Sequence, residues 1–243
     1  MLADIAFVDR PDHVMSLDDD FKLLKAKSRE VCRLVGAHLT KQYGFEKMAV
    51  RWTVSSAVKA ISPRRRFEVG LAHFGWVFDS NLSPTYTYFS DEVAEVAHFD
   101  VDKTLLPDPT VRATAASRAY DMTGRARNFT LKFDLNSRVD VLSYDICAAI
   151  DRTLPSFMET CSDHLRLLTT LRDPNDGPRY RFLAEERLRS VFALLYRSEA
   201  PQSSFDEELQ KCRALLIQCG AERSAASAEA YAKAFAERWL RDR

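Results

Sequence analysis

Apolar spacing predicts a long helix near the start of the chain, over residues 16–43. Its apolar side chains recur every three or four residues, at Leu24, Val31, Val35 and Leu39. This is the spacing of one buried face of an α-helix. Ser16 can cap the amino end, and Gly44 stands where helices commonly end in a left-handed residue.

Alternating apolar and polar residues predict strands in the middle of the chain. A first strand is expected around 50–54, and a long central strand over 67–78, where both faces are apolar. The proline-containing turn at 62–64 separates them. Residues 86–89 indicate a third strand, and 129–135 alternate most regularly of all.

Helical patterns return after the strands. The polar stretch 100–128 contains an alanine-rich segment, 112–120, that favours a short helix. Residues 137–152 carry one apolar face, and Pro155 is expected to begin a separate helical piece. Asp163 can cap a further helix that runs through Leu171.

The last third of the chain is predicted to be entirely helical. Residues 173–178 contain two prolines and a glycine, and they form the best boundary in the sequence. One helix is expected from Phe182 to Leu195. Ser204 and Glu207 have the spacing of a capping box for a helix that ends at Gly220, and a last helix begins near 224.

These elements predict the α+β class. We expect an antiparallel sheet of about four strands flanked by helices, in a core domain of residues 1–172. Residues 179–243 are expected to form an all-helical C-terminal extension. Its exposed apolar side chains suit an interface, so the sequence also suggests a homodimer through these helices.

Composition narrows the function classes. The chain has 243 residues, is 46% hydrophobic and 29% charged, and carries no formal net charge. It is therefore expected to fold, and nothing in its overall charge favours nucleic acid or a membrane as partner. The start of the chain lacks the features of a signal peptide, and a cytoplasmic location is expected. The five scattered cysteines, with Cys212 and Cys219 on one helical stripe, favour core packing.

Charge is arranged in blocks along the chain. Residues 67–102 contain acidic side chains and no Lys or Arg, whereas 103–138 are rich in basic ones. The two blocks either pair with each other or present a polarised surface to a charged partner. Within the acidic block, His98, Asp100 and Asp102 would share one face of an extended segment, and such a set suits a divalent metal ion.

Arginines provide a candidate anion site. Arg64, Arg65 and Arg66 follow the turn after the first strand, with Arg125 and Arg127 as companions in binding phosphate. An arginine run in a turn is also typical of a solvated tip. His38 is expected to be packed and hydrogen-bonded, and His164 to be exposed.

Two stretches resemble a bacterial family catalogued as a domain of unknown function, number 4304. The first is Tyr43-Gly44-Phe45 with Arg66-Phe67-Glu68-Val69-Gly70-Leu71, and the second is 150–159, continuing to 165–168. The resemblance covers about residues 16–172. It implies a helix–sheet–helix architecture and brings no activity, cofactor or site residues.

Motifs for common catalytic chemistry are missing from the sequence. It contains no glycine-rich nucleotide loop, no Gly-x-Ser-x-Gly elbow and no H-E-x-x-H pair. The sequence therefore favours a non-enzymatic module that binds another protein, without a cofactor. The alternative is a metal-dependent enzyme that acts on a phosphate-containing or nucleic-acid substrate.

Overall fold

A computed structural model describes residues 17–51, 54–76, 79–100, 113–122, 131–181 and 183–241. Its centre is a sheet whose strands are β1 (Val54–Ser62), β2 (Arg65–Trp76), β3 (Asp79–Ser90), β4 (Ala115–Arg118) and β5 (Leu131–Phe133). The order is β1-β2-β3-β4, and β5 also pairs with β3. Every pairing is antiparallel, so the predicted α+β class with an antiparallel sheet is confirmed.

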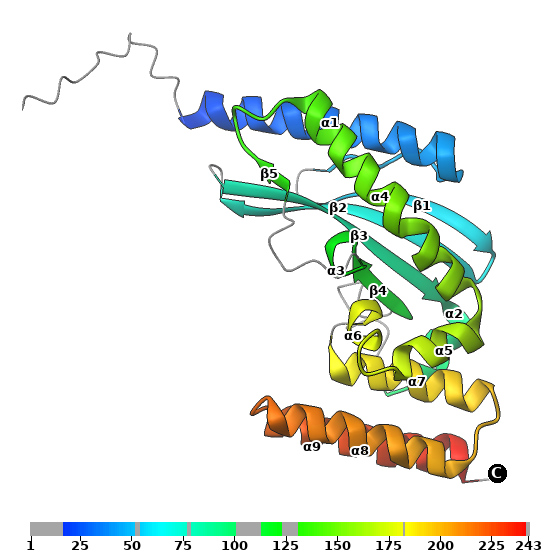
Figure 1. Cartoon of the computed structure of the whole chain (residues 1–243). Coiled ribbons are helices and arrows are strands. Elements are labelled where there is room, and N and C mark those ends of the chain that lie inside the picture. Colours follow the sequence, from blue (N-terminus) through cyan, green and yellow to red (C-terminus); the bar gives the residue numbers. More distant parts are fainter. Residues whose placement is uncertain are drawn as a thin grey trace, which may run out of the picture.

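Two long helices cover the sheet on one side. α1 (Leu17–Tyr43) and α4 (Val139–Ser162) lie side by side and pack against each other, while α1 also contacts β1 and α4 contacts β3 (Figure 1). The predicted apolar stripe of α1 is completely buried. Gly44 ends the helix with a φ of 69°, as the sequence indicates.

Shorter helices continue from the sheet toward the C-terminal end. They are α2 (Asp91–Ala97), α3 (Ala119–Met122), α5 (His164–Arg172), α6 (Gly177–Tyr180), α7 (Ala184–Arg197), α8 (Gln202–Gln218) and α9 (Glu222–Phe235). A π-helical turn, η2 (Ala236–Leu240), completes the described part of the chain. The C-terminal region is thus helical, as predicted.

Helix α7 connects the two ends of the molecule. It packs on α2 and α5 on the side of the sheet, and on α8 and α9 on the other side (Figure 1). One continuous core of buried residues runs from α1 through the sheet to α9. The division into a core domain of 1–172 and an extension of 179–243 remains a prediction.

Three sequence-based predictions are wrong in type or position. The strand expected around 50–54 begins at Val54, and Trp52 lies outside the described residues. The alanine-rich segment 112–120 contributes β4 before α3, because Ala115–Arg118 pairs with the exposed edge of β3. Helix α4 continues through Pro155 because its buried face, which ends at Phe157 and Cys161, holds the last turns against the core.

Helix and strand ends also differ from expectation. Strand β5 has three described residues, shorter than the predicted 129–135, and 123–130 lie outside the described part. Helix α8 begins at Gln202 after Pro201, so Ser204 lies inside it and the predicted capping box is wrong. Gly220, with a φ of 69°, follows α8 as predicted. Cys212 is buried but Cys219 is exposed, so the prediction that both lie on one buried stripe is wrong for Cys219.

No helix in the described ranges combines the length and apolar character that crossing a bilayer requires.

Candidate functional site

The predicted anion-binding arginines lie at the turn between β1 and β2, beside helix α2. Arg64 is 2.7 Å from a Glu95 carboxylate oxygen, and Arg65 is 3.0 Å from Glu92. The Arg66 guanidinium lies 4.2 Å from the centre of the Phe89 ring. Because Arg64 and Arg65 already pair with acidic side chains of α2, an external anion would have to compete with those carboxylates.

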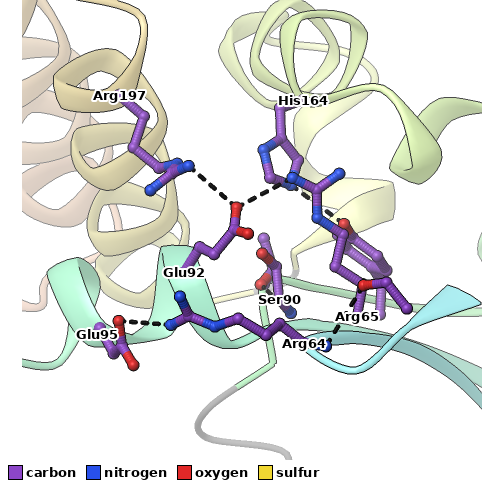
Figure 2. Close-up of polar contacts among 10 residues, drawn as sticks. Arg64, Arg65, Ser90, Glu92, Glu95, His164 and Arg197 are labelled. Atoms are coloured by element: carbon purple, nitrogen blue, oxygen red, sulfur yellow. Dashed lines mark hydrogen bonds and ion pairs between the residues drawn. The ribbon is translucent and has the colours of Figure 1, made fainter. Parts of the chain in front are cut away.

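Glu92 links three elements of the fold. Its Oε2 accepts from Arg65 and from Arg197 of α7, each at 3.0 Å (Figure 2). The hydrogen bond from Arg65 lowers the pKa of Glu92, although partial burial opposes this. The carboxylate therefore stays charged at neutral pH and joins the β1–β2 turn to the C-terminal helices.

His164 lies next to this cluster, at the first position of α5. Its Nε2 is 3.1 Å from the Tyr88 hydroxyl. Burial, together with the nearby charges of Arg65 and Arg197, lowers the pKa of His164 to about 4. The imidazole is therefore neutral at pH 7, and it is partly buried where the sequence indicated an exposed histidine. Burial also raises the pKa of Tyr88 to about 12, so neither group is poised for proton transfer near neutrality.

The predicted metal ligands are not gathered into a described site. His98 is buried at the C-terminal end of α2, and Asp102 lies outside the described residues. Both oxygens of Asp100 accept from the Arg189 guanidinium, at 2.6 and 3.0 Å. Within the described ranges, no three His, Cys, Asp or Glu side chains are placed to hold a metal ion. The metal site remains a prediction.

In the described residues, acidic side chains of residues 67–102 pair with arginines outside the adjoining basic block. In the described residues, the acidic side chains of α2 bind the arginines at the β1–β2 turn, and Arg197 and Arg189 of α7 bind Glu92 and Asp100. Arg125 and Arg127, the other predicted anion ligands, lie outside the described residues. The acidic block therefore helps to attach α7 to the sheet.

A second polar cluster joins α1 to α4. Asp151 Oδ1 lies 2.7 Å from both His38 Nε2 and the Tyr43 hydroxyl. The expectation of a hydrogen-bonded His38 is confirmed. This cluster also brings together Tyr43 and Asp151, one from each of the two stretches that carry the family resemblance.

A groove of about 410 Å³ lies between α5, α7 and α8, beside the turn that leads to α6. Most of its wall is apolar, and the main contributors are Leu171, Pro174, Pro178, Leu188, Val191 and Leu215. Leu215 is 38% exposed, so the apolar wall reaches the surface. A volume of this size lies within the range of ligand-binding pockets.

Charged side chains line one part of this groove. Glu208, on α8, is buried and accepts from Arg172 at 2.9 Å and from Lys211 at 3.0 Å. Arg187, on α7, differs from these groups. Among the described residues, Arg187 makes no side-chain hydrogen bond or ion pair, and burial lowers the pKa of Arg187, although the nearby Glu208 carboxylate opposes this.

Cys212 is the one thiol in the groove wall that the structure describes. Its Sγ lies 3.6 Å from the Ala184 carbonyl oxygen, to which the thiol donates. Burial raises the pKa of Cys212 to about 11, although the Arg187 charge opposes this. The thiol is protonated at neutral pH and is therefore a poor nucleophile.

The sequence did not identify the groove because its residues come from three separated helices. Arg172, Arg187 and Lys211 form no local motif, and the spacing of Leu188 and Val191 is that of any amphipathic helix. One glycine beside the groove wall, Gly177, is required by its surroundings. A Cβ on Gly177 would lie 2.4 Å from the Leu171 carbonyl oxygen and 3.3 Å from Arg187 Cδ, so this wall requires glycine.

No family model, curated protein or solved structure matches this chain. The resemblance to the family of unknown function therefore remains a prediction.

Proposed function

We propose that this chain is a cytoplasmic bacterial protein that binds another protein without catalysing a reaction. In this proposal, an apolar segment of the partner lies in the groove between α5, α7 and α8. The supporting observation is a groove of about 410 Å³ whose apolar wall extends to the exposed Leu215. Burial of that wall by a partner would be favourable because it removes apolar surface from water.

Two features of the described side chains favour binding over catalysis at this groove. The Cys212 thiol is held protonated by burial. The Glu208 carboxylate is engaged by two cations, Arg172 and Lys211, and is therefore not available as a general base without breaking those pairs.

The alternative, a metal-dependent enzyme built on His98, Asp100 and Asp102, gains less support. A metal ion that bound Asp100 would have to displace both hydrogen bonds from Arg189. These bonds also help to attach α7 to α2, so metal binding there would oppose the packing of the helices. An unchanged melting temperature in Mg²⁺, Mn²⁺ or Zn²⁺ is the expected result.

The test is capture of a partner by the tagged protein and by two matched variants of α8. Leu215→Asp places a charge in the groove wall, whereas Ile217→Asp places one on the exposed surface two residues away. We expect a stoichiometric protein from a nuclease-treated lysate of the native organism to bind wild type and Ile217→Asp but not Leu215→Asp. A partner that Leu215→Asp retains, or the lack of any stoichiometric partner, would contradict the proposal.

Light scattering separates a different partner from a second copy of this chain. Dimerisation through the C-terminal helices is the interface suggested by the sequence. If wild type is a dimer and Leu215→Asp a monomer, the groove binds a second copy and the proposal of a different partner is wrong. We expect both proteins to have the same mass in the absence of the partner.

A further inference from the structure

The charges around the groove define the chemistry of its occupant. The lining cations are Arg172, Arg187 and Lys211, and the lining anions are Asp173 and Glu208. Glu207, beside the groove, pairs with Arg172 and Lys211 as well, so three cations meet three carboxylates. The charged group that lacks a partner therefore decides which charge an occupant should carry.

Arg187 is the group that an incoming negative charge would meet. Arg172 and Lys211 each pair with Glu207 and Glu208. Asp173 accepts from the backbone amides of Asn175 and Asp176 in its own turn. Across the described residues, Arg187 is therefore the one charged group of the groove wall without a hydrogen-bonded or ion-pair partner.

The surroundings of Arg187 make an incoming anion favourable. Burial removes water from the guanidinium and lowers the pKa of Arg187. A partly desolvated cation gains more from a direct carboxylate than an exposed one, because fewer water contacts are lost when the pair forms. A Cβ added at Gly177 would lie 3.3 Å from Arg187 Cδ. The aliphatic part of the Arg187 side chain is therefore packed closely against the start of α6.

We infer, as a refinement that rests on the proposed function, that the groove binds the C-terminal end of the partner protein. The terminal carboxylate pairs with Arg187, and the last apolar side chains lie on Leu188, Val191 and Leu215. A chain end fits because it places one negative charge directly beside an apolar side chain. A groove of about 410 Å³ is also close to the size of roughly two or three residues, at the small end of ligand-binding pockets.

The test compares two peptides that differ in one charge. Acetyl-leucyl-leucine carries a free C-terminal carboxylate, and its carboxamide has the same shape without the charge. We follow the methyl signals of Leu188, Val191 and Leu215 by NMR during titration with millimolar peptide. We expect the acid to bind wild type about tenfold more tightly than the carboxamide, and to shift these methyl signals.

Variants assign the preference to Arg187. Arg187→Met keeps the apolar stem and is expected to bind both peptides with the lower affinity of the carboxamide. Arg187→Lys keeps the charge and is expected to retain part of the preference for the acid, which also guards against misfolding of the methionine variant. Arg213→Met, an exposed change on α8 where Arg213 pairs with Glu229, should leave both affinities unchanged.

Several outcomes would overturn the inference. One is equal affinity of wild type for acid and carboxamide, and another is an unchanged preference in Arg187→Met. A third is equal binding of acetyl-leucyl-aspartyl-leucine carboxamide, which would assign the groove to an acidic side chain within a segment. The absence of any methyl shift with millimolar acid would overturn it as well.

The proposed function fails in a different way. If the carboxamide binds as well as the acid, and Leu215→Asp loses the captured partner, the groove is still the binding site and the terminal carboxylate is not what it recognises. If Leu215→Asp retains the partner, the groove is not the interface, whatever the peptides do.

Discussion

The two ends of the buried core differ in their chemistry. Near the sheet, buried tyrosines reach polar partners: the Tyr86 hydroxyl lies 2.7 Å from Thr153, and the Tyr180 hydroxyl donates to Thr160 at 3.1 Å. Among the C-terminal helices, Tyr231 is the buried tyrosine with such a bond, and the surrounding rings are phenylalanines. Phe192 contacts Phe205 and Phe235, each with ring centres 5.2 Å apart.

This difference affects how precisely the elements at each end must be positioned. A buried hydroxyl requires its partner at one distance and angle, because an unpaired polar group in the core is costly. Such pairs therefore define how α4 and α6 fit the sheet. Apolar rings tolerate small shifts at lower cost. The proposed groove lies among the C-terminal helices, and its wall is mostly apolar.

The largest expected effect tests whether the two ends form one cooperative unit. Phe157→Ala near the sheet and Phe235→Ala among the C-terminal helices each remove a completely buried ring. Each variant should lower the free energy of unfolding by about 3–5 kcal/mol, because each leaves a cavity. Urea denaturation followed by circular dichroism and by tryptophan fluorescence measures this loss.

The shape of the transition matters as much as its midpoint. Since one continuous core links the sheet to α9, we expect the two probes to report the same single transition in both variants. If Phe235→Ala separates the signals into two transitions, the C-terminal helices are an independent unit. That result would support the predicted boundary at 173–178 over a shared core.

The second effect concerns His164, which lies between the sheet and the C-terminal helices. Its contribution to the free energy of unfolding depends on pH. The pKa of His164 is about 4 in the fold and about 6.5 in the unfolded chain, so the unfolded chain binds more protons between these values. The stabilisation is therefore complete above pH 6.5 and is lost as the pH falls toward 4. Because His164 is only partly buried, we expect a loss of about 2 kcal/mol rather than the full value.

His164→Gln isolates this contribution. Glutamine does not titrate, yet it can still accept from the Tyr88 hydroxyl. The variant should show a flatter dependence of unfolding free energy on pH between 6.5 and 4 than wild type. An NMR titration that placed the pKa of His164 near its ordinary value would contradict the burial of this imidazole in the structure.

The sequence predicted those parts of the fold that local patterns determine. The buried stripe of α1 follows directly from helical spacing, and Gly44 and Gly220 mark helix ends because glycine adopts positive φ without strain. Asp163 caps α5 as expected, by accepting from the amides of Leu165 and Arg166. Each of these features depends on residues within a few positions of one another.

Predictions failed where distant residues decide the outcome. Residues 115–118 favour a helix by composition, but pairing with β3 supplies ladder hydrogen bonds that outweigh this weak propensity. His164 was expected to be exposed, and its burial depends on Tyr88 and on α7, both remote in the sequence. The candidate groove was missed for the same reason, since it forms only when α5, α7 and α8 meet.

The third prediction compares one buried hydroxyl from each end of the core. Tyr86→Phe removes the bond to Thr153 and should cost about 1 kcal/mol of unfolding free energy. Tyr231→Phe removes a 3.0 Å bond to the Ala97 carbonyl, which also accepts from Arg189, so its cost should be smaller. Thermal or urea unfolding of the two variants measures the difference. Equal or reversed costs would show that the contrast between the two ends does not extend to their hydroxyl groups.

The smallest expected effect concerns the ion pair between Glu92 and Arg197, which joins α2 to α7. A double-mutant cycle with Glu92→Gln and Arg197→Met should give a coupling of about 0.5–1 kcal/mol, because both side chains are partly exposed and water screens the pair. The pKa of Glu92 is lowered in the fold, mainly by Arg65, so the coupling should be present above about pH 4.5 and disappear as the carboxylate is protonated at lower pH. It should also weaken in high salt.

A parallel cycle with Arg65→Met controls for the second guanidinium on the same oxygen. If the Arg197 cycle gives no coupling while the Arg65 cycle does, Glu92 belongs to the sheet end alone, and apolar packing of α7 is what joins the two ends.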